Sequence, residues 1–506
     1  MSQVMVVKML NNNLRVFLLF CVWSCCSSQS NVDFLAAVVE YQPSRNSSDN
    51  FKNYINIIEN IKQGVDFIVF PESTLTVNHP VEALTPNTTS CNSNKTNLDA
   101  IACLAKEKQS YIIVNIDERR NCTKDDDTCP SRGYFVYNTN VIYGKNGSLV
   151  AKYRKWNLFG EVTKNKPSTP DIITFQTDKG TFGTFTCFDI LFSTPPLNLT
   201  RNGVKNIIFT TMWFSELPFL TALQTQQMWA RENNVTFLSS GANNMAVGSG
   251  GSAIILSNRV TNSLTIEPDL NSTNYAKVLY SDVVEPEADV DVVAKSLDKM
   301  KLKQDNLKEY TSTLLPEIGN TTSKICHQSL CCYFEVNKTV TASHNNSYYY
   351  RLVAYSGVRS FSGVYNGGID VCGVVACTDN KTVTSCSERL PNYESITWPI
   401  LFSSIKIRAE FPNEETRIQF PNSLLSSLRP MSQDAIKWEK TINGTNVVRE
   451  LTLLKPTNRL MTFAIYGRNF KADSDPLSNA AVTSNEYNYL SPNVIVLLIG
   501  SILFYI

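Results

Sequence analysis

Short apolar runs alternate with helical patterns along the first part of the chain. The run Asp33–Tyr41 predicts a buried strand. The next segment, Asp49–Lys62, places its large apolar residues on one helical face and predicts an amphipathic helix. Gly64 ends this pattern, and Val65–Pro71 predicts a second strand. The chain is therefore expected to open with a β-α-β unit.

The alternation of strands and helices continues to about residue 310. Further helices are predicted at Leu98–Lys108 and Phe219–Glu232, and a polar surface loop at Val77–Thr96. Asn146-Gly147 lies between two strand-like runs and is a strong hairpin signal. The strand predictions are Tyr111–Ile116, Tyr134–Tyr143, Leu149–Tyr153, Ile172–Phe175, Gly183–Phe188, Ile207–Thr211, Val235–Ser240 and Ser252–Leu256. This pattern favours an α/β domain over residues 31–310.

The pattern changes beyond Asp291–Tyr310, a charged stretch that predicts a helix. Short apolar runs are then separated by turn residues, and the region holds six cysteines. Its strand predictions are Cys332–Val340, Tyr348–Tyr355, Val371–Ala376, Ile400–Phe411 and Leu460–Tyr466. We expect a second, mostly β domain over residues 311–478 that is held by disulfides. Two domains also agree with a length of 506 residues, which is too long for one ordinary core.

Both ends of the chain carry targeting patterns. Residues 1–30 contain basic residues, an apolar run and then small polar residues, as in a secretory signal peptide. Near the other end, small residues from Asn479, a polar spacer and the uncharged apolar tail Val494–Ile506 form the pattern of a GPI-attachment signal over residues 479–506. The tail is shorter than the ~20 residues of a membrane-spanning helix. We therefore expect a protein at the extracellular face of the plasma membrane, GPI-anchored at Asn479 or a neighbour. A plain tail anchor and a tail buried in protein are the alternatives.

The cysteine count agrees with secretion. Of the 14 cysteines, three lie in the predicted signal peptide and ten can form five disulfides. Cys122 and Cys129 are expected to bond to each other, and Cys187 is left without an obvious partner. The ten are Cys91, Cys103, Cys122, Cys129, Cys326, Cys331, Cys332, Cys372, Cys377 and Cys386. No CxxC pairs with a second CxxC or with spaced histidines, so a metal site is not expected.

N-x-S/T sequons also fit a secreted chain, because so many would be unusual in the cytosol. The candidate glycosylation sites are Asn46, Asn87, Asn94, Asn121, Asn146, Asn198, Asn234, Asn271, Asn320, Asn337, Asn345, Asn380 and Asn443.

Charge and histidine content exclude two classes of function. The chain has 46 basic and 45 acidic side chains, a net charge of +1, and no basic run that would follow a phosphate backbone. Nucleic acid is therefore not expected as a partner. The three histidines are His79 in the polar loop and His327 and His344 in the second domain, which disfavours a Cys-His protease.

Cys187 is the first candidate for chemistry. It lies in the stretch Gly180–Phe192, GTFGTFTCFDILF, whose β-favouring residues up to Thr186 predict a strand. Asp189 and its apolar neighbours break the alternation and predict a strand-to-helix turn with the sulfur at its apex. Free N–H groups at such a helix start lower a thiol's pKa and can bind an oxyanion, so we interpret Cys187 as a nucleophile. A packed, inert thiol is the alternative.

Two further side chains follow predicted strands of the same domain. Glu72 ends the second strand, at the edge where α/β sheets bind ligands, and Lys155 lies between aromatic residues after Leu149–Tyr153. An exposed loop glutamate and a surface lysine are the alternatives. Together with Cys187, a carboxylate that takes the thiol proton and an ammonium that stabilises thiolate and oxyanion would make a nucleophile without histidine.

These motifs resemble those of the nitrilase superfamily. FPES at Glu72, YRKWNLFGE at Lys155 and FTCFDILF at Cys187 occur in that family's order, and the second and third are similar to its vanin (pantetheinase) and biotinidase branch. The resemblance covers residues 31–310, and the signal peptide, β-rich second domain and anchor extend it to nearly the whole chain. It implies an α-β-β-α sandwich and hydrolysis of amide carbon–nitrogen bonds without a metal or cofactor.

The resemblance also implies a role for each residue. Glu72 would be the general base, Lys155 would stabilise the tetrahedral intermediate, and Cys187 would attack the carbonyl. The backbone N–H of Phe188 would share the oxyanion, and Glu161 matches a second, supporting glutamate. Lys152 is a rival for the lysine role, but the motif aligns on Lys155.

The substrate is expected to be a small amide, and the protein a monomer or homodimer. The anchor favours a vanin, which would hydrolyse pantetheine to pantothenate and cysteamine. Ser73 and Thr74 follow Glu72 where vertebrate vanins have Asp-Gly, so biotinidase-like hydrolysis of biocytin stays open. A catalytically silent cell-surface glycoprotein that acts by adhesion or ligand binding is the alternative from another class.

Overall fold

The opening β-α-β unit forms as the sequence predicts. β1 (Ala36–Tyr41) is buried along its length, including Glu40, whose Oε1 accepts a hydrogen bond from Asn243 Nδ2 at 2.7 Å. α1 (Ser47–Asn60) begins after Asn46, whose side chain accepts a hydrogen bond from the N–H of Ser48. β2 (Phe67–Val69) then pairs in parallel with β1.

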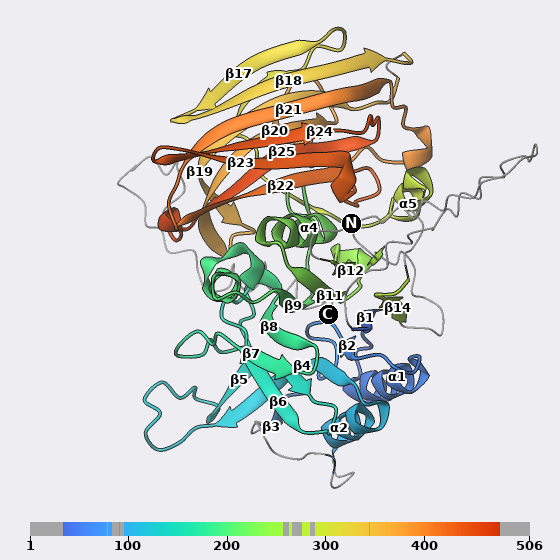
Figure 1. Cartoon of the computed structure of the whole chain (residues 1–506), viewed down its shortest axis with the longest axis vertical. Helices are drawn as coiled ribbons and strands as arrows, with labels where there is room; N and C mark the ends of the chain where they lie inside the picture. Colours follow the sequence, from blue (N-terminus) through green and yellow to red (C-terminus); the bar gives the residue numbers. More distant parts are fainter. Residues whose placement is uncertain are drawn as a thin grey trace, which may run out of the picture. The chain divides into compact units, whose positions relative to one another are not determined.

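The computed structural model describes residues 34–77, 79–82, 91, 96–256, 263–265, 276–283, 289–343 and 345–475 (Figure 1). Several sequence predictions lie outside the described residues: the signal peptide, the GPI signal with Asn479, the sequons at Asn87, Asn94 and Asn271, and His344.

Two mixed sheets form the N-terminal part of the described chain (Figure 1). The first has the order β14-β1-β2-β4-β5-β6, with β3 beside β4: β3 (Val81–Glu82), β4 (Tyr111–Asn121), β5 (Tyr134–Tyr143), β6 (Leu149–Arg154) and β14 (Ala276–Tyr280). The second has the order β13-β12-β11-β9-β8-β7: β7 (Thr174–Thr177), β8 (Gly180–Thr186), β9 (Asn206–Thr211), β11 (Thr236–Gly241), β12 (Ser252–Ile255) and β13 (Ser263–Thr265). Buried hydrogen bonds cross between the sheets, such as that from Asn140 Nδ2 to Thr184 Oγ1 at 2.9 Å.

Helices cover the outer faces of these sheets. α1 and α2 (Asn97–Lys108) share one apolar core with the first sheet. α4 (Ala222–Asn233) shares a second core with the other sheet, and a short α3 (Asn198–Arg201) follows the turn after β8. The N-terminal part is therefore an α-β-β-α sandwich, which confirms the fold that the motifs imply.

The C-terminal part of the described chain consists of two antiparallel sheets (Figure 1). One has the order β16-β19-β20-β25-β22: β16 (Thr311–Leu314), β19 (Tyr349–Phe361), β20 (Tyr365–Cys377), β22 (Arg417–Leu425) and β25 (Leu460–Asn469). The other has the order β17-β18-β21-β24-β23: β17 (Thr321–His327), β18 (Leu330–Val340), β21 (Ile400–Pro412), β23 (Ile436–Asn443) and β24 (Asn446–Leu453). The prediction of a β-rich, disulfide-bonded region is confirmed.

One predicted helix is mostly wrong. In the charged stretch 291–310 the helix is limited to α5 (Val290–Ser296), which begins after Asp289, whose side chain accepts hydrogen bonds from two backbone N–H groups. The chain then leaves the helix and adds β15 (Lys303–Gln304) in parallel to β10 (Glu216–Leu217). Main-chain pairing with β10 replaces helical hydrogen bonds here, and local helix propensity does not record such a partner.

The N-terminal and C-terminal parts pack directly on each other. α4 is buried almost all round, and two of its glutamines contact the C-terminal part: Gln224 Nε2 donates to Asn422 Oδ1 at 2.6 Å and Gln227 Nε2 to the carbonyl of Met431 at 2.6 Å. The described residues from Phe34 onward accordingly belong to one compact unit. The boundary near residue 310 stays a prediction.

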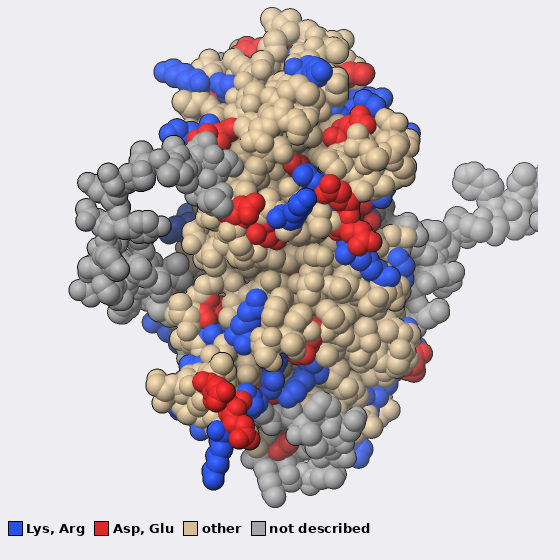
Figure 2. All heavy atoms as spheres, turned by 90° about the vertical axis from the view of Figure 1, so that its left-hand side faces the viewer, with Lys and Arg blue, Asp and Glu red and all other residues tan. Residues whose placement is uncertain are grey.

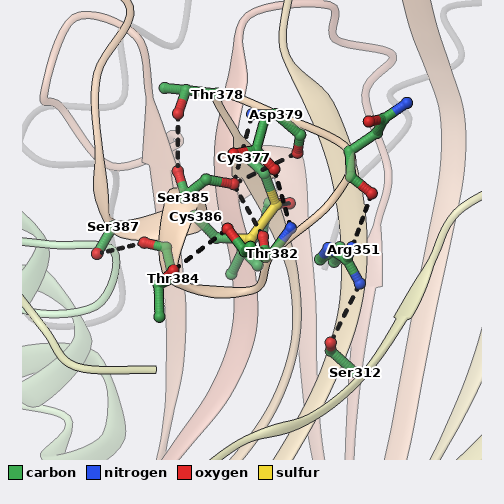
Figure 3. Close-up of a disulfide and its surroundings, with 12 residues drawn as sticks. Ser312, Arg351, Cys377, Thr378, Asp379, Thr382, Thr384, Ser385, Cys386 and Ser387 are labelled. Carbon is green, nitrogen blue, oxygen red and sulfur yellow. Dashed lines mark hydrogen bonds between the residues drawn. A yellow bond between two sulfur atoms is a disulfide. The ribbon is translucent and has the colours of Figure 1, made fainter. Parts of the chain in front are cut away.

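Five disulfides join the ten cysteines that were expected to pair. They are Cys91–Cys103, Cys122–Cys129, Cys326–Cys331, Cys332–Cys372 and Cys377–Cys386. The predicted Cys122–Cys129 bond is confirmed. In Figure 3, the loop closed by Cys377–Cys386 lies beside Arg351, whose guanidinium donates to the carbonyl of Asn380 at 2.9 Å and to Ser312 Oγ at 3.3 Å. The loop is thereby attached to two strands of its sheet.

Surface features leave the secretory predictions open. Of the described sequon asparagines, nine are exposed and Asn198 is half-buried, so the nine are accessible to a glycan. Positive and negative side chains lie interspersed on the face in Figure 2. Within the described part of the chain, no helix is both long and apolar enough to span a bilayer.

Candidate active site

Lys155 lies directly after β6, where its N–H still donates to the carbonyl of Asn138 on β5 at 2.8 Å. Its side chain is 2% exposed, and its Nζ donates to Glu72 Oε1 at 2.8 Å and to Glu161 Oε1 at 3.0 Å. Burial alone would lower the pKa of Lys155, but the negative charges of Glu161 and Glu72 outweigh it and raise the pKa well above its ordinary value. Lys155 is therefore a buried ammonium between two carboxylates.

Glu72 follows β2, and its side chain is 3% exposed. Its Oε1 accepts a second hydrogen bond from Asn138 Nδ2 at 2.8 Å, and its Oε2 accepts one from the N–H of Met212 at 2.7 Å. Met212 comes directly after β9, so donors from both sheets of the sandwich fix the orientation of this carboxylate. The structure places Glu72 beside Lys155, although 83 positions separate them in the sequence.

Glu161 completes the group around Lys155. Its Oε1 also accepts from Asn138 Nδ2 at 2.8 Å, and its Oε2 accepts from the N–H of Phe159 at 2.7 Å. Burial raises the pKa of Glu161, but the charge of Lys155 and these hydrogen bonds outweigh burial and lower it. With two carboxylates around one ammonium, the cluster carries a net charge of −1.

Cys187 lies at a sharp turn between β8 and a 3₁₀ helix at Cys187–Leu191. Its φ of 49° is in the left-handed region, which non-glycine residues rarely adopt. Asp189 fixes the turn, because its Oδ2 accepts from the N–H of Thr186 at 3.1 Å and from the hydroxyl of Tyr153 at 2.7 Å. The predicted strand-to-helix turn is present, and the strand ends at Thr186 rather than at Phe188.

The thiol of Cys187 is free and 6% exposed. Its Sγ lies 3.8 Å from the carbonyl oxygen of Met212, the residue whose N–H binds Glu72. The turn was expected to lower the pKa of this thiol, and that expectation is wrong. Burial and the negative charge of Glu72 raise the pKa, and the positive charge of Lys155 offsets this only in part.

A pocket opens at Cys187. Apolar and aromatic side chains make most of its wall, which also contains one acidic and one basic residue. It is lined by Phe159, Cys187, Phe188, Leu191, Met212, Trp213, Phe214, Glu216, Leu220, Lys303, Phe361 and Ser362. Among the described residues, Glu72 and Lys155 are buried and do not line it, so a bound molecule would meet the sulfur first.

The predicted oxyanion residue, Phe188, lines this pocket. Its ring packs against those of Phe159 and Phe192, with centroid distances of 4.8 and 5.0 Å. Phe361 ends β19 and Ser362 lies in the turn between β19 and β20, so the C-terminal part contributes to the wall. The ring centroid of Phe361 lies 5.8 Å from that of Phe188. No pattern in the sequence indicated that this hairpin reaches the pocket.

Three buried asparagines near the cluster were not identified from the sequence. Asn115 Nδ2 donates to Asn138 Oδ1 at 2.7 Å and to Asn140 Oδ1 at 2.9 Å, and the N–H of Ser73 donates to Asn115 Oδ1 at 2.8 Å. This network fixes the amide of Asn138, which donates to both carboxylates. A signal was present, because Asn138 and Asn140 occupy alternate positions of an otherwise apolar strand and so share one face.

The rival residues contact other groups. Lys152 Nζ lies 2.6 Å from Glu118 Oε1, so this lysine pairs outside the Lys155 cluster. The ring of His327 lies 4.9 Å from that of Tyr355, and its Nδ1 contacts Thr311 Oγ1 at 3.1 Å. No group of three or more potential metal ligands is present in the described residues.

Comparisons with known proteins cover nearly all of the described chain. Residues 35–290 match the carbon-nitrogen hydrolase family, and residues 300–473 match the vanin C-terminal domain. Vanin-like protein 2 of Drosophila melanogaster is 32% identical over 91% of this chain and 94% of its own, and vanin-like protein 3 is 35% identical over 88% and 90%. Human pantetheinase is 29% identical over 76% of this chain and 73% of its own. The chain belongs to the carbon-nitrogen hydrolase family and, within it, to the vanin-like proteins.

Proposed function

We propose that this protein is an amidohydrolase that cleaves pantetheine to pantothenate and cysteamine through a thioester on Cys187. Membership of the carbon-nitrogen hydrolase family supports an enzyme that hydrolyses amides. Pantetheinases among the relatives support the choice of substrate. The observation that carries the proposal is the free thiol of Cys187 in a pocket wall, next to Met212, which also binds Glu72.

In the first half of the reaction, the thiol of Cys187 gives its proton to Glu72 as the sulfur attacks the amide carbonyl. The raised pKa of Cys187 means that the thiol is protonated at rest, so deprotonation has to accompany attack and requires a nearby base. The ammonium of Lys155 and the N–H of Phe188 stabilise the tetrahedral oxyanion. The carbon–nitrogen bond then breaks, and Glu72 gives the proton to the leaving amine.

In the second half, Glu72 takes a proton from water, and the resulting hydroxide attacks the thioester. Collapse of the second tetrahedral intermediate breaks the carbon–sulfur bond, releases the acid and returns a proton to the sulfur. Glu161 keeps Lys155 in place throughout, because it stays paired to the ammonium while Glu72 changes its protonation state.

The test is cysteamine release from pantetheine by the purified wild-type protein and by Cys187→Ala. We expect the variant to lose at least about 10³-fold in kcat/KM, as removal of a nucleophile does, with an unchanged thermal unfolding midpoint. Equal release from both proteins would contradict the mechanism. Release from biocytin but not pantetheine would assign the biotinidase-like activity, and no release from any amide would favour the silent binding protein.

We also propose that the chain is secreted and GPI-anchored. A signal peptide at residues 1–30 and an attachment signal at 479–506 would flank a catalytic domain (31–310) and a β-rich domain (311–478). Disulfides and exposed sequon asparagines support an oxidising, glycosylating route. Release from intact cells by a phosphatidylinositol-specific phospholipase is the expected result; retention on the membrane would indicate a spanning tail.

A further inference from the structure

Lys303 is the basic residue of the pocket wall, and its backbone is firmly positioned. It lies on β15, which pairs in parallel with β10 so that Lys303 is opposite Glu216. Its N–H donates to the carbonyl of Ser215 at 2.9 Å. Two residues on, the N–H of Asp305 donates to the carbonyl of Leu217 at 2.9 Å. These bonds hold Lys303 next to the segment Met212–Phe214, which also lines the pocket beside Cys187.

The ammonium of Lys303 is not matched by a carboxylate. Its Nζ lies over the rings of Phe159 and Phe214, 4.8 and 5.0 Å from their centroids, and it donates to Ser362 Oγ at 3.2 Å. No carboxylate of the described residues lies within 4.0 Å of it. Burial lowers the pKa of Lys303, and the negative charge of Glu216 opposes this effect.

Glu216 lines the same pocket, but its charge is used elsewhere. Arg359 Nη2 lies 2.5 Å from Glu216 Oε1, and Arg359 Nη1 lies 2.9 Å from Asp305 Oδ2. Arg359 is 6% exposed, so this ion cluster is a buried contact between the two parts of the chain. Among the described residues that line the pocket, Lys303 is the one cation, and its ammonium can donate a hydrogen bond to a ligand.

We propose that Lys303 determines substrate specificity by donating a hydrogen bond to an oxygen of the amide substrate, a hydroxyl, carbonyl or carboxylate remote from the scissile bond. The same charge disfavours amides that carry an ammonium group in this place. The inference rests on the proposed function, and it names the chemical class of substrate that the pocket accepts. A lysine that merely packs on two rings would contribute to stability but would not discriminate between ligands by charge.

Alkylation of Cys187 tests the inference without turnover. Iodoacetate and iodoacetamide are similar in size, but only iodoacetate is an anion, so the ratio of their rates at Cys187 reports the charge of the pocket. We expect Lys303→Met to lower the iodoacetate rate by about tenfold relative to iodoacetamide, because it removes a charge that attracts anions into a cleft. Lys303→Arg should keep the wild-type ratio. Lys301→Met is the matched control, since Lys301 is exposed two positions away. An unchanged ratio in Lys303→Met, or an equal change in Lys301→Met, would overturn the proposal.

A substrate series then tests selection during turnover. Its members share one scissile amide and differ only in a remote hydroxyl, carboxylate, methyl or ammonium group. We expect Lys303→Met to lower kcat/KM by about tenfold or more for the hydroxyl and carboxylate members, because a half-buried donor is lost, and to change the methyl member little. A larger effect on the carboxylate than on the hydroxyl identifies charge as the recognised property, and equal effects identify hydrogen bonding. If wild type hydrolyses no member while the alkylation ratio still depends on Lys303, the proposed function fails and anion recognition by Lys303 stands. Lys303→Gln provides the same readings if Lys303→Met does not fold.

Discussion

The α/β sandwich and the C-terminal β part both bury cations, but they pair them differently. In the sandwich, Lys155 is shared by Glu72 and Glu161, and this group of net charge −1 lies next to a free thiol. In the β part, two of the buried arginines pair with carboxylates outside its sheets: Arg359 with Glu216 and Asp305, and Arg449 with Glu232 of α4. The Lys155 cluster lies beside a free thiol, whereas the arginine pairs join the two parts of the chain.

The two uses of buried charge predict different consequences of substitution. Removing one carboxylate of the Lys155 cluster should change activity more than stability, because Lys155 keeps Glu161 as its partner. Removing the cation of either cluster should lower stability, since it leaves carboxylates buried without a partner, and in the Lys155 cluster activity should be lost as well.

Glu72→Gln should give the largest effect on activity. It removes the proposed base and leaves Lys155 paired with Glu161, a neutral pair, so kcat/KM should fall about 10²- to 10⁴-fold. The free energy of unfolding should fall by about 1–3 kcal/mol, because the amide oxygen can accept from Lys155 and Asn138 but the amide NH2 then faces the N–H of Met212. Hydrolysis assays and urea unfolding measure the two quantities.

Lys155→Met is the contrasting substitution. It leaves two buried carboxylates on one asparagine amide, so it should lose activity and also destabilise by about 3–5 kcal/mol. The alternative of a surface lysine, which would be lost at little cost to the fold, is wrong because the Lys155 side chain is buried. Equal free energies of unfolding for Lys155→Met and Glu72→Gln would contradict the net charge of −1 assigned to the cluster.

Arg359→Met should destabilise by about 3–5 kcal/mol, since Glu216 and Asp305 lose their shared partner. Burial raises the pKa of Asp305 to about 7, so the folded state binds its proton more tightly than the unfolded chain. Stability from this group is present at low pH and is lost as pH rises through about 7. In urea unfolding, the loss in free energy of unfolding of Arg359→Met relative to wild type should therefore be smaller at pH 5 than at pH 8. Arg408→Met, an exposed position on β21, should stay within about 0.5 kcal/mol of wild type at both pH values.

The sequence supplied the chemical parts of the site and most of its scaffold. Apolar runs predicted β1, β5 and β9 closely because each is buried and continuous, and the cysteine count left Cys187 unpaired. Glu72, Lys155 and Cys187 were identified because each follows a strand of one α/β domain.

The rest depends on partners that are distant along the chain. Asn138 bridges Glu72 and Glu161, and Ser362 enters the pocket from a hairpin that strand periodicity does not connect to Cys187. β23 and β24 were missed because charged residues interrupt their apolar positions. The pKa of Cys187 was predicted with the wrong sign, because burial and Glu72 outweigh the turn, and neither quantity can be read from local sequence.

The disulfides offer a second comparison of the two parts. Cys332–Cys372 joins β18 to β20, strands of different C-terminal sheets, across 40 positions, whereas Cys122–Cys129 closes a loop of the sandwich across 7. On a chain-entropy model, loops of these sizes correspond to about 4 and about 2.5 kcal/mol. Cys332→Ala/Cys372→Ala should therefore lower the free energy of unfolding more than Cys122→Ala/Cys129→Ala. Both should hydrolyse substrate normally below their unfolding transitions, and a selective loss of activity in the first would indicate that the β part acts on the site beyond packing.

The smallest expected effect concerns the pH dependence of Cys187. Its raised pKa predicts that alkylation by iodoacetamide keeps accelerating through pH 9.0, the ordinary value for a thiol, because only the thiolate reacts. Glu72 contributes to that shift, so Glu72→Gln should move the curve to lower pH even though the variant hydrolyses poorly. Mass mapping of the non-reduced protein should locate the label at Cys187, since the other described cysteines are disulfide-bonded. A plateau below pH 9.0 in wild type would mean that Lys155 outweighs burial and Glu72, and the thiol would then be ionised before substrate arrives, which would remove the need for Glu72 in the attacking step.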